Sequence, residues 1–211
     1  DVMDMLSPLA AQKHIDMAFY YADNVPTQVI GDALRFKQIL TNLISNAIKF
    51  TPDGEIIVRA RMEHGDIGQC LLHFSVQDSG IGLSGTDRKK LFESFSQGDA
   101  SVTRQFGGTG LGLAISKQLV HLMQGQIGFE DNQERAPTEK GSTFWFTAMF
   151  TVNDEIEIVH PHFNNMQVVS YLAHPATANI LRHYLENYDV HHVETSSILD
   201  LFSQLNQFSE S

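Results

Sequence analysis

The segment from Asn42 to Thr51 reads N-L-I-S-N-A-I-K-F-T and has two contrasting faces if it is helical. With about 3.6 residues per turn, Asn42, Asn46 and Lys49 fall at i, i+4 and i+7 and share one narrow stripe. The opposite side of this helix carries apolar residues, namely Phe36, Leu40, Leu43, Ile44 and Ala47. The segment therefore predicts a helix with one face in a core and two amides and an ammonium group in a row on the other.

This polar stripe has two interpretations. It is either an ordinary solvated helix face or a binding surface. Asn is a mediocre helix former, and a merely wet face is more easily built from Glu, Lys or Gln. Amide oxygens are suitable ligands for Mg²⁺, and a lysine can meet phosphate oxygens directly. The stripe thus favours a floor for a magnesium nucleotide.

A first glycine motif, Asp78-Ser-Gly80-Ile-Gly82, follows a strand predicted at 69–77. Glycines there allow close backbone approach and positive φ. An ionised Asp78 could accept a hydrogen bond from an exocyclic amino group, which would select adenine over guanine. The structural alternative is a simple Asx-type turn. The match of Gly80-x-Gly82-x-x-Gly85 to the dinucleotide fingerprint is rejected, because a charged segment follows it and no strand is predicted at 101–106.

A second glycine run, Gly107 to Leu113, opens a helix predicted at 111–123. Backbone N–H groups at a helix N-terminus favour phosphate. The run lacks the Gly-Lys-Ser/Thr ending of a Walker A loop. The polar segment 96–106 before it predicts a mobile lid, with Arg104 in reach of a terminal phosphate.

The remaining patterns predict an α+β fold, with helices on one face of a mixed sheet. Asp32 is placed to cap the Asn helix, a helix over 1–13 is expected to be interrupted at Ser7-Pro8, and His64-Gly65-Asp66 is expected to form a hairpin turn. Further elements are expected as strands at 15–21, 55–62, 126–130 and 142–152 and a helix at 87–95.

Charge divides the chain. Residues 1–153 carry 13 basic and 17 acidic side chains, whereas residues 154–211 carry 1 and 8. This split predicts a domain over 1–153, a linker over 154–165 and a second domain over 166–211. The lack of clustered basic residues argues against nucleic acid as a partner. The single cysteine excludes an internal disulfide framework, and the start, which has no basic segment of a signal peptide, suggests a piece of a longer protein.

Four segments together carry a resemblance. Asn42–Thr51, Asp78–Gly82, Phe92–Phe95 and Gly107–Leu113 resemble, in this order, the N, G1, F and G2 boxes of sensor histidine kinases. These kinases have the GHKL, or Bergerat, ATP-binding sandwich, and the resemblance covers residues 1–152. The amino-acid sequence from Phe95 to Ser101 resembles the corresponding sequence of hybrid sensor kinases of the BarA and GacS group.

The resemblance implies that the chain binds ATP and Mg²⁺. It implies that Asn46 is the metal ligand, that Asn42 and Lys49 help to hold metal and phosphates, and that Asp78 binds the adenine amino group. Phe50 would lie beside the base. The other nucleotide contacts that it implies are Gly80, Gly82, Arg104, Gly108, Thr109, Gly110, Leu111, Gly112 and, in the base pocket, Thr143.

Position 42 distinguishes subfamilies. The topoisomerase, chaperone and mismatch-repair ATPases of this fold resemble one another in having Glu there as a general base. The amide of Asn42 has no useful basicity, so slow or absent hydrolysis and retention of the γ-phosphate for transfer are predicted. The rival interpretations are a nucleotide-sensing module without transfer and a hydrolytic ATPase.

The acceptor histidine of the family is followed by an acidic residue, and none of the ten histidines here is. This chain alone is therefore not expected to autophosphorylate. The resemblance implies an acceptor-His helical domain of the same parent protein as one partner and a downstream receiver or response regulator as another. It also implies a dimeric parent anchored in the bacterial inner membrane, with this domain in the cytoplasm.

Residues 166–211 alternate between strand and helix patterns and resemble the first half of a receiver domain. A receiver has an acidic pair after its first strand, where this chain has Ala173-His174-Pro175. A degenerate receiver-like domain that is not phosphorylated is predicted. A metal site at His160 and His162 or at His191 and His192 is disfavoured, because no cysteine or third spaced ligand accompanies them.

Overall fold

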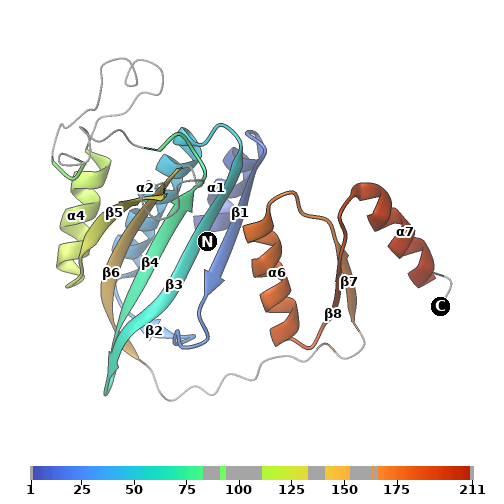
Figure 1. Cartoon of the computed structure of the whole chain (residues 1–211). Coiled ribbons are helices and arrows are strands. Elements are labelled where there is room, and N and C mark those ends of the chain that lie inside the picture. Colours follow the sequence, from blue (N-terminus) through green and yellow to red (C-terminus); the bar gives the residue numbers. More distant parts are fainter. Residues whose placement is uncertain are drawn as a thin grey trace. The chain divides into compact units, whose positions relative to one another are not determined.

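The computed structural model describes residues 2–82, 91–93, 111–132, 141–152, 163 and 166–209. The chain divides into two compact units, residues 1–156 and 157–211 (Figure 1). Among the described helices, none combines the length and the apolar character needed to cross a bilayer.

The first unit is a mixed sheet with helices on one face (Figure 1). The helices are α1 (Val2–Ala11), α2 (Ala33–Phe50) and α4 (Gly112–Leu122), and the strands are β1 (Ile15–Tyr21), β2 (Val29–Ile30), β3 (Gly54–Asp66), β4 (Gln69–Asp78), β5 (Ile127–Asp131) and β6 (Ser142–Val152). Strand β1 pairs in parallel with β3, and the order continues antiparallel through β4, β6 and β2, while β5 also pairs with β6. The predicted α+β fold is confirmed.

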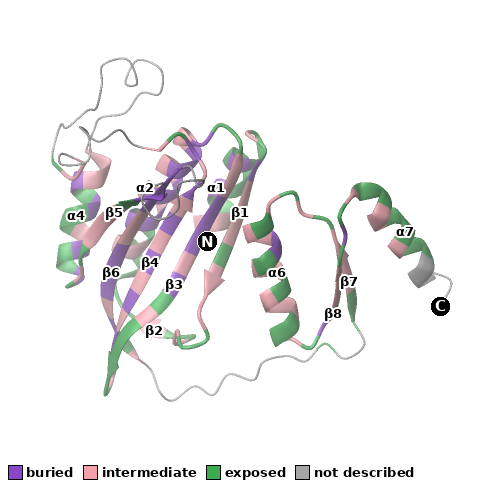
Figure 2. Ribbon diagram, in the orientation of Figure 1, coloured by how far each residue is buried: buried purple, intermediate pink, exposed green. Residues whose placement is uncertain are grey.

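The core lies between this sheet and the helices. Along β4 every second side chain is buried, as expected for a strand with one face on a core (Figure 2). Helix α2 contributes the apolar face that its sequence predicts, since Leu40, Leu43, Ile44 and Ala47 are buried. Phe36 packs edge-on against Phe74, with ring centroids 4.8 Å apart. This packing fixes α2 against the sheet and leaves its polar stripe outside the core.

The predicted interruption at Ser7-Pro8 is wrong, because α1 runs through it. Pro8 has no N–H to donate to the carbonyl of Asp4 one turn earlier, which would normally weaken a helix. The Ser7 hydroxyl donates to that carbonyl at 3.1 Å instead. The side chain of the neighbouring serine therefore replaces the hydrogen bond that proline cannot make.

The hairpin turn between β3 and β4 is also displaced from its prediction at His64-Gly65-Asp66. Those three residues lie in β3, next to an irregularity between Met62 and His64, and the turn is formed by Ile67 and Gly68. Gly68 has φ +75°, and the Asp66 carboxylate accepts a hydrogen bond from the N–H of Ile67 at 2.7 Å. The turn forms where a glycine supplies the left-handed conformation.

The second unit alternates strand and helix. It contains β7 (Gln167–Ser170), α6 (Pro175–Asn187), β8 (His191–Glu194) and α7 (Ile198–Ser209), and β7 pairs in parallel with β8. Pro175 stands in the first turn of α6, where its missing N–H does no harm. Buried Ala178 and Val190 supply its small interior.

Candidate functional site

The polar stripe of α2 is formed as predicted. Asp32 caps the helix by accepting a hydrogen bond from the N–H of Arg35 at 3.0 Å, and the helix ends at Phe50 with Thr51 as its C-cap. Asn42, Asn46 and Lys49 are all half-buried. The stripe is therefore neither buried in the core nor fully exposed.

Asn42 joins α2 to α4. Its Nδ2 amide donates to Ser116 Oγ at 2.9 Å, and Ser116 itself is buried. A Cβ at Gly112 would lie only 2.3 Å from Asn42 Oδ1. The absence of a side chain at Gly112 thus lets the first turn of α4 pack directly on the Asn42 amide.

The other two stripe residues lie further along α2. Among the described residues, no hydrogen bond reaches the side-chain amide of Asn46. The Lys49 ammonium lies 4.9 Å from the centroid of the Phe50 ring, which is within cation–π distance. The sequence did not predict that Lys49 and Phe50 contact each other. Among the described residues, the amide oxygen of Asn46 thus receives no hydrogen bond, which is compatible with the ligand role that the resemblance implies.

Asp78 is a buried carboxylate at the end of β4. Its Oδ1 accepts hydrogen bonds from the N–H groups of Gly80 at 2.9 Å and Ser142 at 3.3 Å. Burial raises the pKa of Asp78 to about 6, and these two bonds oppose the rise. Within the described residues, neither bond nor any other ends on Oδ2. A buried carboxylate with one oxygen anchored and one left over fits a donor from a ligand.

A polar network that the sequence did not predict connects Asp78 to β6. The Asn132 amide donates to the carbonyl of Asp78 at 3.1 Å, and the Thr143 hydroxyl donates to Asn132 Oδ1 at 2.7 Å. All three residues are buried. Thr143, which the resemblance places in the base pocket, is thereby linked to Asp78. No local pattern marks Asn132, which follows directly after β5.

The glycines around Asp78 serve close packing. A Cβ at Gly80 would lie 2.4 Å from the carbonyl oxygen of Phe50, and one at Gly141 would lie 1.9 Å from the carbonyl oxygen of Asp78. Gly82 has φ +72°, in agreement with the expected left-handed conformation. Gly80 therefore allows the loop to approach the end of α2 rather than only a ligand.

The N-terminus of α4 is the described part of the second glycine run. Leu111 is its N-cap and provides no side-chain hydrogen bond to the first turn. Helix N-termini with N–H groups left over favour anions. Leu111 and Gly112 thus form the beginning of α4, whereas Arg104, Gly108, Thr109 and Gly110 lie outside the described residues.

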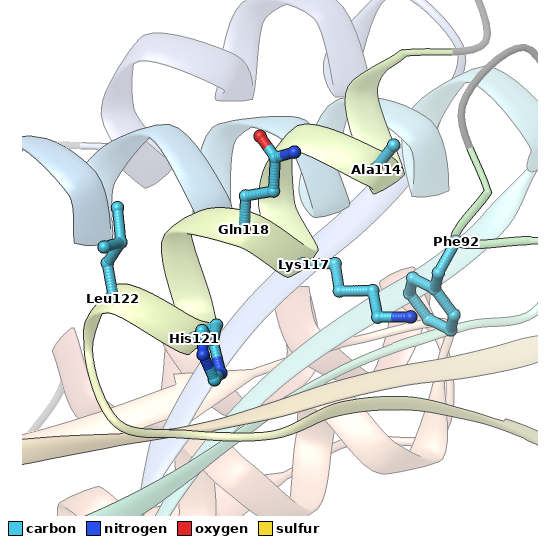
Figure 3. A pocket seen from close by; sticks show the side chains of 6 residues that line it. All are labelled: Phe92, Ala114, Lys117, Gln118, His121 and Leu122. Carbon is cyan, nitrogen blue, oxygen red and sulfur yellow. The ribbon is translucent and has the colours of Figure 1, made fainter.

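A separate hollow of about 570 Å³ lies along α4, and Figure 3 shows Lys117 extending toward the Phe92 ring beside it. Phe92 belongs to the segment that resembles the F box. Among the described residues, the lining of the hollow contains none of those predicted to bind nucleotide; it consists of Phe92, Ala114, Lys117, Gln118, His121 and Leu122. The hollow is therefore not assigned to the Asp78 site.

Comparison with known proteins agrees with this geometry. The family model described as "Histidine kinase-, DNA gyrase B-, and HSP90-like ATPase" matches residues 31–152. The chain is 41% identical to the sensor histidine kinase GacS of Pseudomonas protegens over 189 residues, which are 89% of this chain and 20% of that protein. It is 38% identical to the signal transduction histidine-protein kinase BarA of Escherichia coli over 161 residues, which are 76% of this chain and 17% of that protein. The chain thus spans about a fifth of the length of these relatives.

Solved structures show the same relationship. Full-length ShkA in complex with AMPPNP matches 96% of this chain and 40% of its own, with a TM-score of 0.72 and 27% identity. The catalytic domain of histidine kinase ThkA matches 72% of this chain and 90% of its own, with a TM-score of 0.55 and 27% identity. The chain therefore belongs to the histidine kinase-, DNA gyrase B- and HSP90-like ATPase family, and within it to the ATPase domains of two-component sensor histidine kinases.

Proposed function

We propose that this chain binds ATP with Mg²⁺ and presents the γ-phosphoryl group to a histidine on a separate helical domain. The observation that carries the proposal is the buried Asp78 carboxylate, which has Oδ1 anchored by two backbone N–H groups and Oδ2 left over. The domain proposed for this task comprises residues 1–153.

Adenine selection follows from the chemistry of Asp78. Its Oδ2 would accept a hydrogen bond from the exocyclic amino group of adenine, and guanine offers a carbonyl oxygen at that position. Thr143 and Asn132 hold Asp78 from the side of β6. Phe50 and Gly80 would line the same pocket, because Gly80 packs on the Phe50 carbonyl.

The phosphate side of the site would be formed by α2 and α4. Asn46 is the proposed ligand of Mg²⁺, with its amide oxygen available among the described residues. When bound, the metal supplies charge neutralisation between phosphates. Lys49 would meet phosphate oxygens, and the N-terminus of α4 at Leu111 and Gly112 would offer N–H groups. Gly82, Gly108, Thr109, Gly110 and Arg104 complete the proposed contacts.

Transfer rather than hydrolysis is proposed because position 42 carries an amide. Asn42 is bound to Ser116 and cannot take a proton from water. The chain would act by orienting the γ-phosphoryl group and balancing its charge, while the acceptor histidine supplies the nucleophile. The acceptor domain, a downstream receiver and dimerisation belong to the proposed parent protein, which we place in the bacterial inner membrane with this domain in the cytoplasm.

The second unit is proposed to be a degenerate receiver-like domain over residues 166–211, joined by a linker at 154–165. His174 and Pro175 follow β7 and begin α6, at the place where a receiver carries its acidic pair. This unit is therefore not proposed to accept a phosphoryl group.

Calorimetric titration of the chain with ATP and Mg²⁺ tests the nucleotide site. Asp78→Asn should weaken ATP binding about tenfold or more, because a charge-assisted hydrogen bond contributes about 1.5–3 kcal/mol. Asn46→Ala should remove most of the dependence on Mg²⁺. No binding by the wild-type chain would contradict the proposal.

A second experiment separates transfer from its rivals. Wild-type chain, ATP and the purified acceptor-helix domain of a parent protein should yield phosphohistidine, with little free phosphate. Binding without phosphohistidine would favour a nucleotide-sensing module. Steady phosphate release that Asn42→Ala abolishes would favour a hydrolytic ATPase.

A further inference from the structure

Lys13 lies in the turn between α1 and β1, far from Asn46 and Asp78 in the sequence, yet its side chain contacts the C-terminal end of α2. Its ammonium donates to the carbonyl oxygens of Ile48 at 2.7 Å, Lys49 at 3.1 Å and Thr51 at 3.3 Å. The contact is partly buried. One side chain thus satisfies three carbonyl groups at the C-terminus of α2.

These carbonyls are the ones that a helix leaves without partners. The last four C=O groups of an α-helix have no intrahelical donor, and the helix dipole places negative charge there. A cation with three donors matches both needs. The adjacent Thr51 hydroxyl does not help, because it is fully buried and finds no hydrogen-bond partner in the described part of the chain.

The carbonyl group of Phe50, which Lys13 does not contact, has a different hydrogen-bond donor. It accepts a hydrogen bond from the N–H of Ile81 at 3.3 Å, in the loop that begins with Asp78. The carbonyls of residues 48, 49 and 51 therefore go to Lys13, and the carbonyl of residue 50 goes to the Asp78 loop. The turn that carries Lys49 and Phe50 is fixed between these two donors.

We infer that Lys13 is a positioning residue for nucleotide binding: it holds the last turn of α2 so that Lys49, Phe50 and the Asp78 loop keep one geometry. The inference rests on the proposed nucleotide site. It also means that the segment before β1 is coupled to that site, because Lys13 lies in the turn between α1 and β1.

The test compares three variants of the full 211-residue chain. Lys13→Met keeps the aliphatic stem and removes the donors, whereas Lys13→Arg keeps a cation with several donors. Lys37→Met is the matched control, since Lys37 lies exposed on α2, the helix whose C-terminal end Lys13 contacts. Affinity for Mg-ATP is measured by calorimetry at a temperature where circular dichroism shows each variant to be folded.

We expect Lys13→Met to bind Mg-ATP about three- to tenfold more weakly, with Lys13→Arg and Lys37→Met within about twofold of wild type. A merely structural cap would lower the melting temperature but leave the affinity of the folded chain unchanged. A folded Lys13→Met that binds like wild type would overturn the inference and leave the proposed function standing. A wild-type chain that binds no nucleotide would overturn both.

A measurement on the wild-type chain covers the case in which Lys13→Met does not fold. Coupling is reciprocal, so a contact that favours nucleotide must itself be favoured by nucleotide. Mg-ATP should therefore slow amide hydrogen exchange in the 12–15 turn as well as in the Asp78 loop. Slowed exchange in the loop alone would overturn the inference.

Discussion

Asn42 donates its side-chain amide to the buried hydroxyl of Ser116, at 2.9 Å. This hydrogen bond joins α2 to α4 at the level of the first two turns of α4. It also orients the amide, because Nδ2 is occupied and Oδ1 faces the Cα of Gly112. Asn42 thus acts as a joint between two helices, in addition to any contact with phosphates.

Removing the hydroxyl of this joint should destabilise the chain. Ser116→Ala leaves the half-buried Asn42 amide without its acceptor, so the free energy of unfolding should fall by about 1–2 kcal/mol. Urea denaturation followed by circular dichroism measures it. Gln118→Ala, on an exposed position of the same helix, is the control and should change stability by less than about 0.5 kcal/mol. Equal losses for both variants would contradict the role of the joint.

Gly112→Ala should change sign with the residue at position 42. In the wild-type background the new Cβ would meet Asn42 Oδ1 at 2.3 Å, so a loss of about 1–3 kcal/mol is expected. In an Asn42→Ala background the same change should stabilise by about 0.5–1 kcal/mol, because alanine is a better helix former than glycine. A urea-based double-mutant cycle reports the reversal, and additive effects would show that the two residues do not meet.

Asp78→Asn should stabilise the nucleotide-free chain. Burial raises the pKa of Asp78 to about 6, so stability linked to its protonated form is lost as the pH rises from about 4 through about 6. The uncharged amide avoids this loss and can still accept the two backbone N–H groups. At pH 7 we expect a gain on the order of 1–3 kcal/mol in urea denaturation, together with weaker ATP binding. A variant less stable than wild type at pH 7 would contradict this account.

The same pKa predicts that nucleotide affinity depends on pH. Protonation of Asp78 would replace a carboxylate acceptor by a neutral group and so weaken the hydrogen bond from adenine. Affinity for Mg-ATP should therefore fall as the pH is lowered from 7.5 to 5.5, roughly in proportion to the ionised fraction. Calorimetry across this range, with Asp78→Asn as the control that should lose the dependence, measures it. A flat profile for wild type would place the titration elsewhere.

Gly141→Ala should be far more damaging than Gly68→Ala. Both glycines have positive φ, so both variants carry backbone strain of about 1 kcal/mol. A Cβ at Gly141 would also lie 1.9 Å from the Asp78 carbonyl oxygen, whereas one at Gly68 meets nothing within 4 Å. We expect Gly141→Ala to lose at least about 2 kcal/mol more in thermal or urea unfolding. Similar losses would mean that the loop next to Asp78 can move aside.

Local patterns were sufficient for much of the fold. The faces of α2 and the Asp32 cap follow from helical periodicity and from the chemistry of one residue, and the strand predicted at 69–77 is found as β4. The turn of the first hairpin lies at Gly68 and not at the predicted Gly65, because Gly65 and its neighbours pair with β4. The interruption predicted at Pro8 does not occur, because the Ser7 hydroxyl replaces the hydrogen bond that proline cannot make.

The contacts between distant elements at the candidate site could not be predicted from local sequence patterns. Asn132 matters because pairing of β5 with β6 brings it next to Thr143 and the Asp78 carbonyl. Lys13 matters because its partners are carbonyl groups more than 30 positions later in the chain. Neither residue has a local signature, since its role arises only from packing between distant elements. The roles assigned to Asn46, Lys49 and Thr143 toward ATP remain predictions.

From the parallel pairing of β1 with β3 we expect an order of events in folding. Strands β3 and β4 are separated by a two-residue turn, so we expect them to pair early. Strand β1 is separated from β3 by a long segment that includes α2, so we expect these two strands to pair later. Because Lys13 lies just before β1, we expect its contacts with the end of α2 to form when β1 pairs. In stopped-flow refolding we therefore expect β-structure to appear before nucleotide affinity, and a chain interrupted between the two steps would hold a formed hairpin and a frayed end of α2.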